Sequence, residues 1–249
     1  MTVYLSNELK VGATTRQFCY RRDRSDEVVI KQTFVDQQYD LRRIRRAPEL
    51  LEFVQWQEAN HLRPLVVDAG ANIGATPIYF MANFPRALVV AIEPDCENFE
   101  LLSKNVTGLN VEPIRGAISS VAGRNRVFDP GEGYCGYRTQ SVAQTDADTD
   151  TVPGITINDI YATHPSPFFP FIVKVDIEGA EMDLFSGNTE WVARTPLLII
   201  ELHDWLLPKG GPSRSFLQCI SKLDRDFVYI GENVFSIAND LGRLAVTAP

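Results

Sequence analysis

From Pro64 to the end of the chain, short apolar runs alternate with amphipathic stretches, and this alternation constrains the possible fold most strongly. It predicts an α/β fold in which parallel strands are connected by helices that cover both faces of one sheet. The last two predicted strands are joined by only three residues, so they must be antiparallel, because a parallel pair needs a long crossover. The predicted strands are 65–68, 87–92, 111–118, 171–176, 197–202, 227–230 and 234–238, and the predicted helices are 73–83, about 95–107, 156–162, from about 180, and 212–223.

The first 63 residues differ in character and are predicted to form a small N-terminal adjunct to a domain that spans 64–249. Residues 16–20 and 28–35 are rich in β-branched and aromatic side chains, which is typical of strands. Residues 48–60 predict a helix, because a proline stands near the first turn and apolar side chains recur on one face. The stretch 120–150 is rich in Gly, Asp, Thr and Gln and predicts strand fragments within an irregular insertion.

Composition excludes several classes of protein. No apolar run approaches the roughly 18 residues that a membrane span needs, and the first residues lack the pattern of a signal peptide. Cys19, Cys96, Cys135 and Cys219 lie far apart without a CxxC pair. A zinc knuckle or a disulfide scaffold is therefore not expected, and we predict a cytoplasmic protein.

The net charge of −8 is unevenly distributed. Residues 1–63 carry 11 basic and 9 acidic side chains, so the remaining chain carries 13 and 23, a balance of −10. Such an acidic body argues against nucleic acid as a partner, because binding many phosphates requires positive charge. The exception is residues 42–46, with four arginines, which form either a solvated helix start or a contact with an anionic substrate group.

The strongest chemical motif is Val66-Val67-Asp68-Ala69-Gly70-Ala71-Asn72-Ile73-Gly74, where a strand turns into a helix. Glycine lets a ligand approach the backbone closely, and the helix N-terminus offers free N–H groups. Glu93 follows at the end of the next strand, where a carboxylate can accept hydrogen bonds from both hydroxyls of a ribose. The turn lacks the central glycine of a dinucleotide-binding G-x-G-x-x-G motif, which disfavours NAD. Asp68 before the turn suits a cationic amino-acid group better than a diphosphate.

Four segments, VVDAGANIGATPIYF, AIEPDCENFELLSKN, FIVKVDIEGAEMDLF and LLIIELH, occur in this order over about residues 64–205. Together they resemble the FkbM family of S-adenosylmethionine-dependent methyltransferases, which act mostly on hydroxyl oxygens of sugars and related natural products. The resemblance implies a Rossmann-like class I methyltransferase fold, with a mostly parallel seven-stranded sheet and an antiparallel last strand.

The resemblance also implies roles for individual residues in binding S-adenosylmethionine. Glu93 would hold the ribose, and Ala117 lies where such enzymes contact adenine. The family usually has a polar Asn or Asp close to this position, whereas this sequence has Arg115-Gly116. The adenine contact is therefore expected to be mostly apolar or made by the backbone. The methionine part would be held by Asp68, Gly70, Ala71, Asn72 and Gly74, and Asp176 is also assigned to the cofactor site.

A second cluster comprises Asp176, Glu178 and Glu181, with Glu201 and His203 at the end of the next strand. Methyl transfer to a hydroxyl requires that the acceptor oxygen lose its proton, and a neutral histidine is well suited to accept it near pH 7. We predict His203 as this base, oriented by Asp176 and Glu201, although His203 as a packed structural residue and Glu181 as a helix cap are alternatives. The same side chains, with Glu178, could hold a divalent cation, which would lower the pKa of the acceptor. The metal-free version is slightly favoured, because Glu178 and Glu181 stand at a helix start.

We therefore predict an S-adenosylmethionine-dependent O-methyltransferase that acts on a hydroxyl of a sugar, glycoconjugate or related natural product. Its acceptor site would be shaped by the N-terminal segment, with Tyr39, Arg42 and Arg43 as substrate-binding residues. The alternatives are an N-methyltransferase of an amino acid or peptide, a nucleic-acid modifying protein and a non-catalytic binding fold. A homo-oligomer also stays open.

Overall fold

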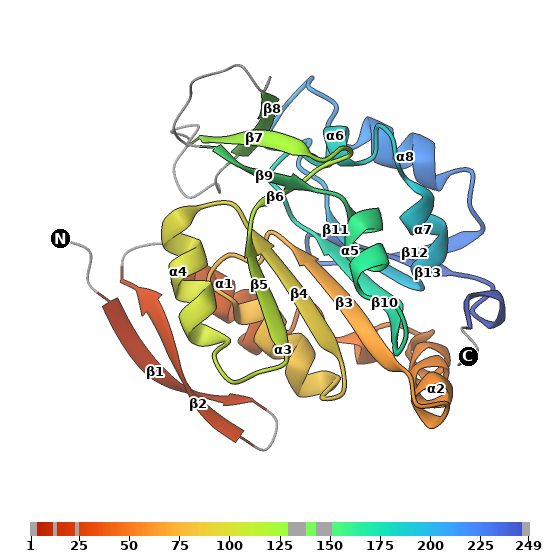
Figure 1. The fold of residues 1–249 in the computed structure, drawn as a ribbon, viewed down its shortest axis with the longest axis horizontal. Helices are drawn as coiled ribbons and strands as arrows, with labels where there is room; N and C mark the ends of the chain where they lie inside the picture. The colour runs from red at the N-terminus through yellow and green to blue at the C-terminus, as the bar shows by residue number, and fades with distance from the viewer. Residues whose placement is uncertain (1–3, 12–13, 23–24, 129–137, 143–150, 246–249) are drawn as a thin grey trace.

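The computed structural model describes residues 4–11, 14–22, 25–128, 138–142 and 151–245, and its centre is a seven-stranded sheet (Figure 1). The strand order is β12-β13-β11-β10-β3-β4-β5, and β13 is antiparallel to both of its neighbours while the remaining pairs are parallel. The predicted fold class and the antiparallel last strand are confirmed. The strands are β3 (Arg63–Ala69), β4 (Leu88–Glu93), β5 (Val111–Arg115), β10 (Phe168–Val175), β11 (Leu197–Glu201), β12 (Arg225–Ile230) and β13 (Asn233–Ala238).

Helices cover both faces of this sheet and bury a separate apolar core on each. Consecutive side chains of β3 show the division: Val66 belongs to one core, whereas Leu65 and Val67 belong to the other, as the alternation of a strand requires. The first core includes side chains of α2 (Ala47–Ala59) and α3 (Ala75–Asn83). The second core includes side chains of α5 (Ile157–Thr163), α6 (Glu181–Leu184), α7 (Glu190–Arg194) and α8 (Arg214–Ile220).

The order of the strands reverses between β3 and β10, and this reversal positions the site. The chain proceeds from β3 outward to β4 and β5, then returns to β10 on the other side of β3. Loops that leave neighbouring strands in opposite directions open a crevice at the carboxyl ends of the strands. Gly70 permits the close approach of the two loops there, since its φ is +80° and a Cβ would lie 1.8 Å from the carbonyl oxygen of Asp176.

The N-terminal segment contains one confirmed strand and one wrong prediction. β1 (Tyr4–Val11) and β2 (Thr14–Arg21) pair antiparallel beside α4 (Cys96–Asn105), as Figure 1 shows. Residues 28–35 are helical, in α1 (Asp26–Ile30) and the π-helical turn η1 (Lys31–Val35), and not a strand. Their β-branched residues favour a strand locally, but Ile30 and Phe34, four residues apart, pack against one apolar cluster as in a helix. The helix predicted at 48–60 is confirmed by α2.

A small second sheet stands above the carboxyl edge of β5. Its order is β6 (Ala117–Ile118), β9 (Thr151–Ile155), β7 (Gly123–Phe128) and β8 (Arg138–Val142). The predicted strand 111–118 is thus divided at Gly116 between two sheets. The strand fragments expected within 120–150 are confirmed where described, whereas residues 129–137 with Cys135, and 143–150, lie outside the described residues. No helix in the described part of the chain has the length and apolar character needed to cross a membrane.

Candidate cofactor and catalytic site

A cavity lies at the carboxyl ends of β3, β4 and β10. Ala71 and Gly74 do not line it but shape its loop, because the Ala71 N–H donates to the Ile92 carbonyl and Gly74, with φ +92°, precedes α3. Pro94, Asn98, Thr139 and Ile177 line the cavity without having been predicted. The predicted residues that line it are Gly70, Asn72, Glu93, Ala117, Asp176 and Glu178.

Glu93 is the buried carboxylate of this cavity. It accepts hydrogen bonds from the backbone N–H of Asn72 (2.9 Å), from that of Asp95 (3.0 Å) and from the side-chain amide of Asn98 (3.3 Å). Burial raises the pKa of Glu93 to about 7, although these three donors act in the opposite direction. Glu93 therefore connects the loop after β3 to the start of α4 and places a carboxyl group that titrates near neutral pH in the cavity wall.

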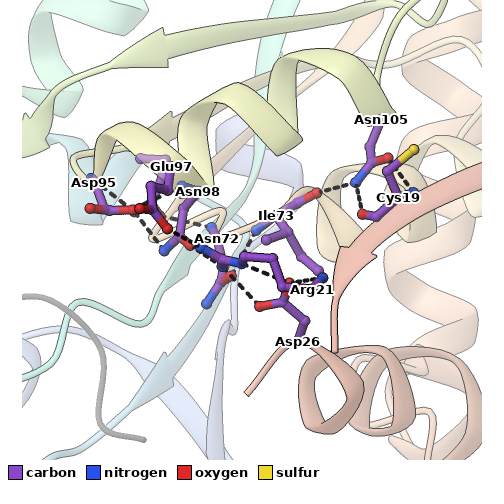
Figure 2. A network of polar contacts seen from close by, with 10 residues as sticks. Cys19, Arg21, Asp26, Asn72, Ile73, Asp95, Glu97, Asn98 and Asn105 are labelled. Atoms are coloured by element: carbon purple, nitrogen blue, oxygen red, sulfur yellow. Dashed lines mark hydrogen bonds and ion pairs between the residues drawn. The ribbon is translucent and has the colours of Figure 1, made fainter. Parts of the chain in front are cut away.

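A polar network joins β2 to this wall (Figure 2). The Arg21 guanidinium is 4% exposed, pairs with Asp26 at 2.9 Å and donates to the side-chain oxygen of Asn98 at 2.5 Å. The amide of Asn98 in turn donates to Glu93. Arg21 was not predicted, because Asn98, through which it reaches the cavity wall, lies 77 residues away in the sequence.

Asn105 makes a second connection between the same elements. Its side-chain oxygen accepts from the N–H of Cys19 (2.8 Å), and its amide donates to the carbonyls of Cys19 (2.9 Å) and Ile73 (2.8 Å), as Figure 2 shows. One side chain of α4 thereby joins β2 to the loop before α3.

Lys174 lies beneath the cavity and was also not predicted. Its Nζ donates to the Gly70 carbonyl at 2.7 Å and lies 3.1 Å from Asp68 Oδ1 and 3.5 Å from Asp176 Oδ2. Burial alone would lower the pKa of Lys174, but Asp68 and Asp176 outweigh it and raise that pKa, so the amine is charged. Asp68 is fully buried and absent from the cavity lining, so the cation it contacts is Lys174. A lysine within the apolar run Phe171-Ile172-Val173-Lys174-Val175 was the sequence signal that could have indicated this pair.

His203 is 1% exposed and surrounded by carboxylates. Its Nδ1 lies 2.9 Å from Glu181 Oε1, and its Nε2 lies 3.4 Å from Glu178 Oε2 and 3.6 Å from both Asp176 Oδ1 and Glu201 Oε1. The structure thus brings the predicted catalytic side chains together, because they follow the neighbouring strands β10 and β11.

The charges in this cluster favour a cation at its centre. Burial lowers the pKa of His203, but the hydrogen bond and charge of Glu181, then Asp176 and Glu178, raise it to about 9. The imidazole alone would therefore carry a proton at neutral pH, unlike the neutral ring that the sequence interpretation assumed. Burial, followed by the charge of Asp176, raises the pKa of Glu201 to about 8.

Of the residues predicted to bind the acceptor, the structure buries Tyr39 and exposes Arg42 and Arg43. Burial raises the pKa of the Tyr39 hydroxyl well above its usual range, and the nearby charges of Lys174 and Asp176 also act on it, so Tyr39 lies close to the site. Arg42 pairs with Asp40 at 2.9 Å and its side chain is 73% exposed. Arg43 donates at 3.4 Å to the backbone carbonyls of residues 36 and 37.

Comparisons with known proteins identify a family and several relatives. The model of the methyltransferase FkbM domain matches residues 68–230. Hexuronic acid methyltransferase AglP of Haloferax volcanii is 29% identical over 165 residues, which cover 64% of this chain and 66% of AglP. Methyltransferase sdnD of Sordaria araneosa is 26% identical over 159 residues, which cover 51% of this chain and 61% of sdnD. The chain therefore spans just under two thirds of the length of the curated relatives it matches.

The solved structures that the chain matches are much more distant in sequence. The bifunctional kinase-methyltransferase WbdD has a TM-score of 0.42 and 11% identity, covering 84% of this chain and 42% of WbdD. Aeropyrum pernix fibrillarin, solved with natively bound S-adenosyl-L-methionine, has a TM-score of 0.37 and 12% identity, covering 75% of this chain and 72% of fibrillarin.

Proposed function

This chain belongs to the FkbM methyltransferase family, and we propose that it transfers a methyl group from S-adenosylmethionine to a hydroxyl of a sugar or glycoconjugate. The observation that carries the proposal is the cavity at the carboxyl ends of β3, β4 and β10, with the buried Glu93 carboxyl in its wall. The relative described as a hexuronic acid methyltransferase supports a sugar acceptor with a carboxylate.

The residues present fit this cofactor. Glu93 would accept hydrogen bonds from the ribose hydroxyls, Gly70 and Asn72 would contact the amino-acid part, and Ala117 would pack on the adenine. Asp68 acts through Lys174, whose Nζ holds the carbonyl of Gly70 and thereby the shape of the loop.

When bound, the cofactor supplies a methyl group on a positively charged sulfur, which keeps the electron pair of the broken C–S bond as the new O–C bond forms. The chain has to hold the acceptor oxygen about 3 Å from the methyl carbon, in line with the bond that breaks, and to take its proton. Asp176 and Glu178 line the cavity, and Glu201 and His203 lie beside them. This cluster would receive the hydroxyl proton, an assistance that typically contributes about 10²–10⁴-fold to the rate.

The direct test is calorimetric titration of the protein with S-adenosylmethionine. Glu93→Ala should weaken binding by about 1.5–3 kcal/mol, or roughly 10- to 150-fold, because it removes hydrogen bonds to a charged acceptor. Glu100→Ala is the matched control, since it removes a carboxylate from α4 that does not line the cavity. Absence of binding to the wild type, or equal affinity in both variants, would contradict the proposal.

We also propose a cytoplasmic location. Among the described residues Cys19, Cys96 and Cys219 are free thiols, which is the usual state in a reducing compartment. Labelling of thiols in the intact protein, with and without a reductant, tests this assignment.

A further inference from the structure

The Nε2 atom of His203 is surrounded by carboxylate oxygens, which are atoms that commonly bind metal ions. The other ring nitrogen, Nδ1, is engaged by Glu181, whose side chain is fully buried. When Nδ1–H donates to this carboxylate, a neutral ring carries its lone pair on Nε2. The Nε2 atom lies 3.4–3.6 Å from carboxylate oxygens of Asp176, Glu178 and Glu201.

The distances within this cluster suit a shared ion better than direct hydrogen bonds. A charge-assisted N–H···O bond is about 2.7–2.9 Å long, whereas Nε2 lies 3.4 Å from Glu178 and 3.6 Å from Asp176 and Glu201. Around a metal with bonds of about 2.0–2.2 Å, neighbouring ligand atoms are about 3.0–3.6 Å apart. One ligand atom each of Asp176, Glu178 and His203 lie within 4.8 Å of one another.

The residues that contact these side chains resemble those that orient the ligands of a metal site. Histidines that bind a metal almost always donate their other N–H to a carboxylate or carbonyl, which fixes the tautomer and the orientation of the ring. Glu181 does this for His203, and Lys174 lies 3.5 Å from the second oxygen of Asp176. Two of the three groups that would bind an ion, His203 and Asp176, are therefore in contact with buried partners.

We propose that a divalent first-row metal ion binds between His203 Nε2 and the carboxylates of Asp176 and Glu178. One imidazole and two carboxylates form a mixed N/O set, which suits Mn²⁺ or Zn²⁺ better than Ca²⁺. Asp176 and Glu178 line the cofactor cavity, so further coordination positions of the ion face the space where an acceptor would bind.

The catalytic use of this ion rests on the proposed methyl transfer. An acceptor hydroxyl bound to the ion becomes more acidic. Its O–H bond would break, its proton would pass to solvent water, and its oxygen would form the O–C bond while the C–S bond breaks toward sulfur.

The test is a titration of the full chain with Mn²⁺, followed by electron paramagnetic resonance, in the absence of cofactor and acceptor. The wild type should bind one ion per chain, and His203→Asn should weaken binding at least 10-fold. The matched control is His164→Asn, because His164 also lies 3.1 Å from one carboxylate, Glu112, but outside the cluster. That variant should bind Mn²⁺ like the wild type.

A second variant keeps the test conclusive if His203→Asn does not fold. Glu178 is partly exposed, so Glu178→Gln should keep the fold, as circular dichroism would verify, and still weaken Mn²⁺ binding at least 10-fold. Absence of saturable binding to the wild type, or full binding by both variants, overturns the metal site. Two further measurements separate the two proposals: calorimetry with S-adenosylmethionine and an activity assay, both in the presence of EDTA. Cofactor binding and turnover without any metal would reject only the ion. Mn²⁺ binding by a protein that does not bind the cofactor would reject only the methyl transfer.

Discussion

At the scale of single residues, Glu93 couples the cofactor cavity to pH. Burial raises its pKa to about 7, so the ionised fraction rises from about one tenth at pH 6 to about nine tenths at pH 8. The carboxylate is the form that accepts hydrogen bonds from both ribose hydroxyls. We expect the affinity for S-adenosylmethionine to increase by up to about 10-fold over this range, as measured by calorimetry. Glu93→Gln should bind more weakly and lose this rise, and a wild type whose affinity falls or stays flat would contradict the assignment.

Gly70 sets the distance between two loops. A Cβ there would lie 1.8 Å from the Asp176 carbonyl oxygen, and φ is +80°, so Gly70→Ala combines steric overlap with backbone strain. We expect it to lower the free energy of unfolding by at least about 3 kcal/mol in urea denaturation. Gly108→Ala is the control, since φ is +77° but no atom lies within 4 Å of the added Cβ. It should cost only about 1–2 kcal/mol, and equal losses would show that crowding at Gly70 is unimportant.

The sequence pattern predicted several of the residues that line the cavity but not the residues that hold them in position. Gly70 and Asn72 lie in the turn between β3 and α3, and Glu93 ends β4, the next strand, so their positions follow from elements that are contiguous in the sequence. Lys174 is different: it donates to the carbonyl of Gly70, 104 residues earlier, so its role exists only once β3 and β10 are neighbours. The placement of such a residue depends on strand order, which no local spacing contains.

At the scale of elements, the hairpin of β1 and β2 is linked to the cofactor site through α4. Arg21→Ala would leave the buried Asp26 carboxylate without its charged partner, with only the backbone N–H of residue 21 still donating to it, at an expected cost of about 3–5 kcal/mol of stability. It would also release Asn98 from one partner, so we expect weaker S-adenosylmethionine binding as well. Arg225→Ala is the matched control: this buried arginine donates to the carbonyls of Thr195 and Ser236. Calorimetry on both folded variants should show loss of affinity only for Arg21→Ala, and equal affinities would limit Arg21 to a structural role.

The elements themselves were predicted well where long-range packing and local preference agree. The inner strands β3, β4, β10, β11 and β13 are mostly buried, and their apolar runs are visible in the sequence. Residues 28–35 show the opposite case: β-branched side chains favour a strand, yet Val28 and Val35 are exposed and the segment is helical. Tertiary packing of Ile30 and Phe34 decided the conformation there.

At the scale of the whole molecule, the N-terminal segment reaches the carboxyl edge of the main sheet. The side chain of Gln38 accepts a hydrogen bond from that of Asn233 at 3.3 Å, and Asn233 is the register partner of Glu201. Gln32 donates to Glu232 in the β12–β13 turn at 3.2 Å. Since Tyr39 adjoins Gln38, this segment borders the cluster around His203, where an acceptor would enter.

This arrangement leads to a prediction for Arg42 and Arg43. Both follow Tyr39 closely and are exposed, and a guanidinium can pair bidentately with the carboxylate of an acidic sugar. We expect the double variant Arg42→Ala/Arg43→Ala to raise KM for a uronic-acid acceptor about 10-fold or more, while the Kd for S-adenosylmethionine stays unchanged. Arg45→Ala is the control, because it removes an exposed arginine from the same run. Steady-state kinetics with acidic and neutral sugars test this prediction. An equal KM in all variants would show that the arginines are only a solvated surface. A rise in KM confined to the acidic acceptor would show that Arg42 and Arg43 select acceptors by their charge.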